Sequence, residues 1–148
     1  MRTHFFIILL CFLCTLDHTS LAQKATTFQN AQGKWGYKDK NGKVKIPAKY
    51  DYIRVASLKN SKRLIVIKDK KYALYTTDGN GITGFTYQMI SVPNPDSQLI
   101  LAKKSELYGY INSQGKTVLP FKYSNASNFK DGKANVWLNR RLFMIDTS

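Results

Sequence analysis

The sequence KWGYKDKNGKVKIPAKY, residues 34–50, is the unit from which the fold is built, because the chain repeats it twice with substitutions. A second copy covers residues 71–87 (KYALYTTDGNGITGFTY) and a third covers residues 107–123 (LYGYINSQGKTVLPFKY), and both align without a gap. A period of about 35 residues is typical of repeat architectures. The shared columns hold an aromatic residue (Trp35, Tyr72, Tyr108), a turn glycine (Gly42, Gly79, Gly115), a proline (Pro47, Pro120) and a tyrosine (Tyr50, Tyr87, Tyr123).

Each copy predicts a β-hairpin. Asn41-Gly42 is a strong hairpin signal, because both central positions of a type I′ turn need positive φ. Asp78-Gly79 and Gln114-Gly115 take the same place in the other copies. Counting outwards from a two-residue turn gives the register of the first hairpin: Lys40 faces Lys43, Asp39 faces Val44, Lys38 faces Lys45, Tyr37 faces Ile46, Gly36 faces Pro47 and Trp35 faces Ala48.

The same counting in the third copy places Tyr110 opposite Leu119 and Tyr108 opposite Phe121. Gly109 then faces Pro120, as Gly36 faces Pro47. Proline gives the ladder no donor, and a partner without a side chain leaves room for its ring. We therefore expect a local bend or bulge at this point.

A third strand follows each hairpin, at residues 64–67, 99–102 and 134–137, after polar connectors at residues 57–63, 93–98 and 125–133. Tight turns are expected around Asp69-Lys70, Ser105-Glu106 and Asn139-Arg140. Residues 26–31 can form an opening strand. The expected fold is all-β: tandem three-stranded antiparallel meanders, stacked or propeller-like, with repeats at about 33–69, 70–105 and 106–139 and a half repeat at 140–148.

The N-terminal segment is typical of a signal peptide. Arg2 precedes an apolar run at residues 5–12, and Ser20-Leu21-Ala22 offers the small residues that a signal peptidase reads. We expect cleavage after Ala22, export to the periplasm or the cell exterior, and a single domain over residues 23–148. The apolar run is shorter than the roughly 20 residues of a membrane-spanning helix, so an integral membrane protein is not expected.

The pattern WG…NGK…IP..Y resembles the bacterial WG-containing repeat family, also called KWG repeats. The resemblance covers about residues 33–148. The first copy matches well, and the third keeps Gly109, Gly115, Leu119, Pro120 and Tyr123, with Tyr108 in place of tryptophan. The second copy has Ala73 and Gly84 where the glycine and proline would stand. The resemblance implies an all-β repeat fold and no particular activity.

The net charge of +14 is concentrated in the first repeat, since residues 34–71 hold thirteen Lys or Arg against three Asp. One face of the first hairpin could therefore bind an anionic polymer or surface. The candidate anion-binding residues are Lys38, Lys40, Lys43, Lys45, Lys49 and Arg54. The alternative is that these lysines cap the first repeat, because terminal repeats need a polar outer face and the equivalent columns become apolar in later copies (Tyr75, Ile82, Ile111, Val118).

The aromatic residues could form a stacking platform for sugars or bases, but their fixed repeat columns favour a place in the core. Those expected to be core residues are Trp35, Tyr37, Tyr72, Tyr108, Tyr110, Phe121 and Trp137. Tyr75 and Tyr87 are the candidates for exposure.

Catalysis is not expected. Residues 23–148 contain no His and no Cys, and Glu106 is the only glutamate. The Asp-x-Asn spacing of Asp78 and Asn80 lacks the distal glutamate of a calcium loop, so a turn is the preferred interpretation, and no cofactor or metal is expected. A small glycan hydrolase would need two carboxylates across a cleft, and Asp39, Asp78 and Asp146 lie at or near the expected turns.

These observations predict an exported, non-catalytic binding or scaffolding module. The expected partner is a protein or a cell-envelope polysaccharide, which could be anionic, and not a nucleic acid. Two alternatives remain open: binding of an anionic polymer through the basic first repeat, and a glycan hydrolase that uses an Asp pair.

Overall fold

The computed structural model describes residues 24–147, and the expected signal peptide at 1–22 lies outside them. The described residues form strands joined by turns and loops, and none of them belongs to a helix that is long and apolar enough to cross a membrane. The strands are β1 (Thr26–Gln29), β2 (Trp35–Lys38), β3 (Val44–Tyr50), β4 (Tyr52–Leu58), β5 (Ser61–Lys68), β6 (Lys71–Thr76), β7 (Met89–Ile90), β8 (Leu99–Lys104), β9 (Leu107–Asn112), β10 (Thr117–Tyr123), β11 (Asn125–Ala126), β12 (Lys133–Leu138) and β13 (Arg141–Asp146).

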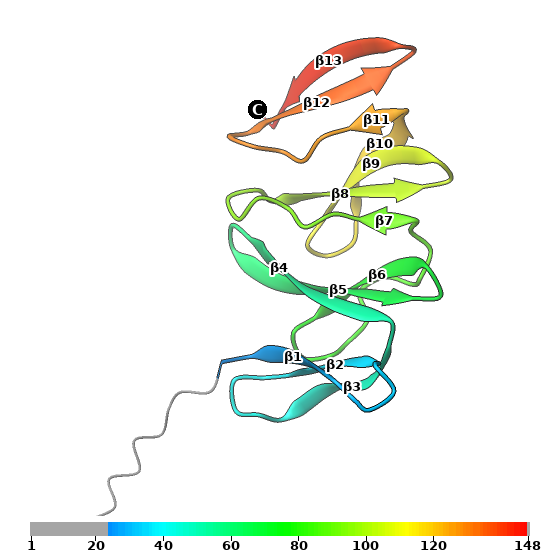
Figure 1. Ribbon diagram of the computed structural model, residues 1–148. Coiled ribbons are helices and arrows are strands. Elements are labelled where there is room, and N and C mark those ends of the chain that lie inside the picture. Colours follow the sequence, from blue (N-terminus) through cyan, green and yellow to red (C-terminus); the bar gives the residue numbers. More distant parts are fainter. Residues whose placement is uncertain (1–23, 148) are drawn as a thin grey trace, which may run out of the picture.

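The strands form four small antiparallel sheets that follow one another along the molecule in chain order (Figure 1). Their strand orders are β1-β2-β3, β4-β5-β6, β10-β9-β8-β7 and β11-β12-β13. We call them the first to fourth sheets. The third strand of each sequence repeat pairs with the first strand of the next repeat, as β5 does with β6, so the sheets are offset from the sequence repeats. The all-β prediction of stacked meanders is confirmed.

In all three copies, the first aromatic residue of the repeat is paired across the hairpin with the tyrosine at its end. Trp35 faces Tyr50 and Tyr108 faces Tyr123 across the hairpins of the first and third sheets. Tyr72 and Tyr87 form an isolated antiparallel bridge at the same place in the second repeat. Equivalent residues thus occupy equivalent positions in all three copies, which is what a true structural repeat requires.

The hairpin turns differ from the predicted type I′. Gly42 has φ +76°, but Asn41 is not among the described residues with positive φ. Asp39 N–H donates to Lys43 O, and Gly42 N–H donates to Asp39 O, each at 3.0 Å. This is the longer loop in which a single left-handed glycine forms a bulge. The Asp39 carboxylate accepts the N–H groups of Asn41 and Lys43, which holds the loop in that shape.

The predicted register of the first hairpin is therefore correct only in part. Tyr37 does face Ile46, but Lys38 faces Val44 and not Lys45. Lys40 and Lys43 belong to the turn and are not a cross-strand pair. In the third copy Tyr110 faces Leu119 as predicted, whereas Tyr108 faces Tyr123 and not Phe121.

Tyr108 faces Tyr123 and not Phe121 because the strand has the bulge that was expected at the proline. The ladder shifts register between Tyr37 and Trp35, and between Leu119 and Tyr123. The glycine of the WG pair is needed at this shift, because a Cβ on Gly36 would stand 2.7 Å from Ile46 O. A Cβ on Gly109 would likewise stand 2.9 Å from Leu119 O. Real Cβ atoms are not found so close to a carbonyl oxygen, so the glycine allows the bulged strand to approach.

The second repeat lacks this pair and departs from regular pairing. Ala73 is fully buried in the glycine column. The segment after the turn meets β6 through isolated bridges and through Ile82 and Thr83, whose N–H groups both donate to Leu74 O. The Thr83 hydroxyl also accepts the N–H of Leu74 at 2.9 Å. Where alanine replaces the glycine of the repeat, the segment that pairs with the outer side of β6 is thus less regular than the equivalent strands β3 and β10.

The tight turns after the third strands are as predicted. Asp69-Lys70, Ser105-Glu106 and Asn139-Arg140 all have positive φ at both positions, from 49° to 63°. This is the type I′ geometry, achieved here without glycine. The flanking residues pair directly, as Lys68 does with Lys71.

The predicted connectors are wrong in two places. Residues 57–63 hold the end of β4 and the start of β5, which pair up to Leu58 and Ser61. Residues 125–133 begin with the short strand β11. β4 and β7 (Met89–Ile90) had not been predicted as strands. Residues 93–98 form a loop as expected, and the opening strand ends at Gln29.

The core lies between successive sheets. One cluster joins the first and second sheets, around Tyr37, Ile46 and Leu64. A second joins the second and third sheets, around Leu74, Ile100 and Ile111. A third joins the third and fourth sheets, around Tyr110, Phe129 and Val136. Each sheet is thus stabilised mainly by its neighbours, as in other repeat proteins.

Candidate functional site

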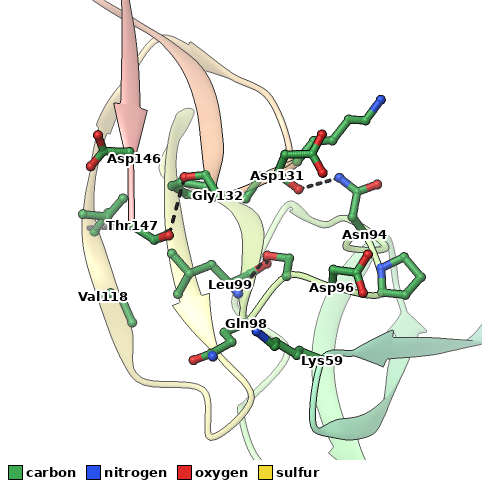
Figure 2. Close-up of a pocket in the computed structure, with 15 residues that line it drawn as sticks. Lys59, Asn94, Asp96, Gln98, Leu99, Val118, Asp131, Gly132, Asp146 and Thr147 are labelled. Atoms are coloured by element: carbon green, nitrogen blue, oxygen red, sulfur yellow. Dashed lines mark hydrogen bonds between the residues drawn. The ribbon is translucent and has the colours of Figure 1, made fainter.

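A cleft of about 660 Å³ involves the third and fourth sheets and their loops (Figure 2). Its walls come from the loop before β8, the loop before β12, the start of β10 and the end of β13. Loops carried on a rigid β scaffold are a common place for binding sites. We call this hollow the loop cleft. Its labelled lining residues in Figure 2 are Lys59, Asn94, Asp96, Gln98, Leu99, Val118, Asp131, Gly132, Asp146 and Thr147.

The two loops of the loop cleft are fastened to each other by side-chain amides. Asn94 Nδ2 donates to the carbonyl oxygen of Phe129, and Asn128 Nδ2 donates to Val92 O at 2.9 Å. Ser91 Oγ donates to Asn128 Oδ1. These bonds link residues about 35 positions apart, so they join equivalent loops of neighbouring repeats. The walls are therefore held in place before any ligand arrives.

The lining of the loop cleft is chemically mixed. Asp96, Asp131 and Asp146 supply carboxylates, while Lys59 and Lys130 supply cations. Three of the eight carboxylates of residues 23–148 thus line one cleft of a strongly basic chain. The apolar part includes Leu99, Val118, Leu119 and Phe129. Such a lining suits a ligand with both polar and apolar faces, such as a peptide or a glycan.

The sequence-predicted anion-binding residues do not form one continuous face. Lys38 Nζ lies 4.7 Å from the centroid of the Phe28 ring. Lys49 lies over Tyr50 and Arg54 lies over Tyr52, at 5.6 and 5.5 Å. Lys40 and Lys43 are exposed in the first hairpin turn. The structure thus brings Lys38, Lys40 and Lys43 to one hairpin end and leaves Lys49 and Arg54 beside separate aromatic rings.

Lys45 has a different environment from the other candidates. Its ammonium group lies 3.6 Å from Asp39 Oδ2 and 3.6 Å from Asp78 Oδ1, so it joins the turns of the first and second repeats. Burial acts to raise the pKa of Asp39, but hydrogen bonds from the N–H groups of Asn41 and Lys43, together with the charge of Lys45, outweigh it and lower that pKa. The Asp39 carboxylate is therefore held ionised between positive partners.

The column that holds Lys38 in the first repeat is half-buried at Tyr75 and buried at Ile111. Tyr75 packs against the cluster between the first and second sheets, and Ile111 is fully buried between the second and third. No described sheet precedes the first one, so Lys38 stays near solvent. This agrees with the interpretation that the lysines cap the end of the stack.

The aromatic columns lie in the core or at its margin, as predicted. Tyr37 and Tyr110 are buried, and the others pack partly buried against the clusters or neighbouring strands. The expectation that Tyr87 is exposed is wrong, because only 7% of it is accessible. Tyr75 is half-buried, and its hydroxyl lies 3.4 Å from that of Tyr50. The described residues thus offer no wide aromatic platform.

Sequence reasoning did not find the loop cleft. The signal that was available is the pair of long polar connectors, at residues 93–98 and 125–133, which stand in equivalent places of neighbouring repeats. Loops at one end of a repeat stack gather on one side of the molecule and often form its binding surface. The amide bonds that join the two loops depend on the tertiary structure and could not be predicted from sequence.

The architecture defines an all-β repeat protein whose sheets stack in chain order. The model of the WG containing repeat family matches residues 35–72 and 108–139. The chain therefore belongs to the WG containing repeat family, as the sequence had indicated. No curated protein and no solved structure showed a significant match. The unmatched residues 73–107 include the second hairpin, whose pairing is the least regular.

Proposed function

We propose that this WG repeat protein is an exported, non-catalytic binding or scaffolding module that holds a peptide or polysaccharide segment in the loop cleft. The observation that carries the proposal is the pair of loops at residues 91–98 and 127–132, which are tied together by Asn94 and Asn128 around a mixed polar and apolar hollow. A preformed cleft of this kind binds without the cost of ordering its own loops.

The carboxylates favour a role without catalysis. A glycosidase needs a general acid whose pKa is raised, together with a second carboxylate across the cleft. Among the described residues, Asp39 and Asp78 share an ion-pair partner, because Lys45 lies between them. Because the pKa of Asp39 is lowered, this group is a poor proton donor near neutral pH. The pair therefore suits a link between turns better than a catalytic dyad.

The signal-peptide pattern at residues 1–22 supports export. An exported protein without cysteine beyond Cys14 cannot rely on disulfides, so its stability depends on the stacking of the sheets. The expected partner is thus another exported protein or a cell-envelope polysaccharide.

The loop cleft can be tested with a variant that fills it. The protein, expressed from the full sequence and purified, is screened against envelope polysaccharides and surface proteins on an array. We expect Gln98→Trp, in the cleft wall, to reduce binding of the retained ligand at least about tenfold, or roughly 1.4 kcal/mol. Thr86→Trp, at an exposed position outside the cleft, is the matched control and should bind as the parent does.

Two results would contradict this proposal. Equal binding by Gln98→Trp and Thr86→Trp would remove the loop cleft as the site. Release of new reducing ends from a bound glycan would show that the protein is an enzyme, and loss of that release in Asp96→Asn or Asp131→Asn would assign the hydrolysis to the cleft.

The second candidate function is binding of an anionic polymer through the first hairpin. It is favoured by the exposure of Lys40 and Lys43 in the turn, close in sequence to Lys38. We expect Lys40→Glu combined with Lys43→Glu to elute from a heparin column at clearly lower salt. Lys116→Glu combined with Lys122→Glu changes the net charge by the same amount at exposed positions of the third repeat outside the loop cleft, and serves as the control. Equal shifts for the two double variants would show a general effect of charge and no site.

A further inference from the structure

A second hollow lies beside the loop cleft, on the side of the second sheet. It has a volume of about 540 Å³, and its walls come from the hairpin of β4 and β5, the start of β8 and the turn after β9. Gln98, Leu99 and Val118 line both hollows, so the two hollows adjoin and together make one groove. In Figure 2, Gln98 and Val118 lie at the side of the loop cleft away from Asp131. We call the second hollow the arginine hollow, after Arg63 in its lining.

The two hollows are the same feature of the repeat, one sheet apart. The arginine hollow is walled by residues between 58 and 63, at the start of β5, and by residues 112–114, at the end of β9. The loop cleft has residues 94–99, at the start of β8, and residues 146–147, at the end of β13, in the equivalent places. Stacked β-sheets pack about 10 Å apart. A ligand that fills both hollows is therefore an elongated molecule, and repeat proteins typically use such extended surfaces for binding.

Arg63 is the charged residue among the described residues that line the arginine hollow. Its Nε donates to Ser113 O at 2.7 Å, and its Nη1 donates to Lys62 O at 2.8 Å. These two bonds orient the guanidinium group and leave further N–H donors of the group available. None of the ion pairs within residues 24–147 involves Arg63. An oriented guanidinium group of this kind suits a carboxylate, which it can bind in a bidentate manner.

The rest of the arginine hollow is lined mainly by neutral polar side chains. These are Asn60, Ser61, Gln98, Asn112, Ser113 and Gln114. Amide and hydroxyl side chains both donate and accept hydrogen bonds, as the hydroxyl groups of a sugar do. In the loop cleft the carboxylates of Asp96 and Asp131 are further acceptors for hydroxyl groups. The lining of the groove thus matches a ligand that is rich in hydroxyl groups.

A polysaccharide fits the arginine hollow better than a peptide does. An extended peptide is held through a free strand edge, with pockets for its alternate side chains. The walls of the arginine hollow are turns and strand ends, and its apolar residues are Leu58, Leu99 and Val118, of which Leu58 is itself buried. The net charge of +14 favours a partner that carries negative charge. Together with Arg63, these features point to a polysaccharide with carboxylate groups.

We infer that the groove binds an acidic polysaccharide, with uncharged sugar units in the loop cleft and a carboxylate-bearing unit in the arginine hollow. The inference rests on the proposed function, because the loop cleft supplies the first of these two subsites. Arg63 binds the carboxylate of the acidic unit, while Asp96 and Asp131 accept hydrogen bonds from hydroxyl groups of the uncharged units. An acidic unit in the loop cleft would meet these two aspartates, which is unfavourable, so charge fixes the register of the polymer.

Acidic polysaccharides and their carboxyl-reduced forms test this inference on one array. The array carries polyuronates and copolymers that alternate a uronic acid with a neutral sugar, each beside the same polymer with its carboxyl groups reduced to alcohols. We expect the parent protein to bind an acidic polymer about tenfold more tightly than the reduced form. Arg63→Gln should abolish this preference and bind the reduced form as the parent does. Arg141→Gln makes the same charge change at an exposed position outside both hollows, and should keep the preference.

A purely structural role of Arg63 predicts a different result. If Arg63 only held the wall through Ser113 O, Arg63→Gln would weaken binding of both forms equally and leave the preference intact, which would overturn the inference. Equal binding of the two forms by the parent protein, or retention of peptides alone, would overturn it while leaving the proposed function standing. A parent protein that retains no ligand would overturn both. Arg63→Lys, which keeps the charge but loses the bidentate geometry, should retain only part of the preference and replaces Arg63→Gln if that variant shows no melting transition.

Discussion

Gly79, in the turn after β6, packs directly on the backbone carbonyl of Lys45 in β3, and a methyl group on Gly79 would overlap that oxygen. Gly115 makes the equivalent contact one repeat later, where a Cβ would stand 3.0 Å from Ile82 Cγ2 and 2.7 Å from Thr83 Cγ2. Lys45 and Ile82 occupy the same column of the repeat. The turn glycine therefore allows the left-handed turn and also allows one repeat to sit closely on the preceding one.

This double role predicts unequal costs for the same substitution. Gly79→Ala places an alanine at φ +91° and against Lys45 O, while Gly33→Ala places one at φ +73° with no atom within 4 Å. The left-handed conformation alone costs about 1–2 kcal/mol. We expect Gly79→Ala to lower the free energy of unfolding by about 1–3 kcal/mol more than Gly33→Ala does, as measured by urea denaturation.

Equal losses of stability for Gly79→Ala and Gly33→Ala would contradict this prediction. They would mean that the turn of the second repeat moves away from β3 at no cost and that φ alone decides the effect.

The glycine of the WG pair makes a second prediction. Gly36→Ala should destabilise the protein by about 1–3 kcal/mol, because its Cβ would meet Ile46 O at 2.7 Å and Phe28 Cζ at 2.6 Å. Ala73 occupies the same column of the second repeat, is fully buried, and is tolerated there. Ala73→Gly should therefore also destabilise, by about 1 kcal/mol, through lost burial and added chain entropy.

Thermal unfolding of the two single variants gives the answer. A neutral Gly36→Ala variant would show that the bulge at Pro47 can shift to accept a side chain, and the stated reason for the WG glycine would then be wrong.

The repeat made much of this fold predictable. The columns of Trp35 and Tyr50, the third strands and the turns such as Asp69-Lys70 follow from patterns within about 35 residues, and the structure has them all. The pairing of Tyr37 with Ile46 was also correct, because it lies between the two irregular points of the hairpin.

The rest depended on interactions that sequence patterns do not reveal. The Asp39 carboxylate accepts hydrogen bonds from two N–H groups and so favours the longer turn over type I′. As a result, the cross-strand partner of Lys38 is Val44 and not Lys45. β4 was missed because its exposed Arg54 and Val55 interrupt the alternation of a half-buried strand. The loop cleft arises from the bonds of Asn94 and Asn128 across neighbouring repeats, and such tertiary contacts leave no local signal.

The turn between β12 and β13 offers a way to stabilise the chain. Arg140 has φ +63° in a type I′ turn, a conformation that costs a residue with a side chain about 1 kcal/mol. Arg140→Gly creates the favoured Asn-Gly sequence and should raise the free energy of unfolding by up to about 1 kcal/mol. Arg141→Gly, one residue further in β13, should instead lower it by about 0.5–1 kcal/mol.

Urea denaturation of both variants checks this prediction. Destabilisation by Arg140→Gly of the same size as by Arg141→Gly would show that Arg140 makes a contribution that outweighs its backbone strain.

The ionisation of the buried Tyr110 is expected to make the stability of the protein depend on pH. Its hydroxyl donates to Ser127 O at 2.7 Å, and burial, together with the charge of Tyr123, raises its pKa to about 12. The ordinary value is about 10, so the folded state favours the neutral phenol. This contribution is complete below pH 10 and is lost as the pH rises from about 10 to 12, by about 2–3 kcal/mol in all.

Tyr110→Phe separates this effect from general alkaline unfolding. Near pH 7 the variant should be less stable by about 1 kcal/mol, because the bond to Ser127 is lost. Above pH 10 its stability should fall less steeply than that of the parent, so the difference between the two proteins should shrink or reverse. Parallel stability curves from pH 7 to 12, measured by denaturation at each pH, would show that the ionisation of Tyr110 does not contribute to alkaline unfolding.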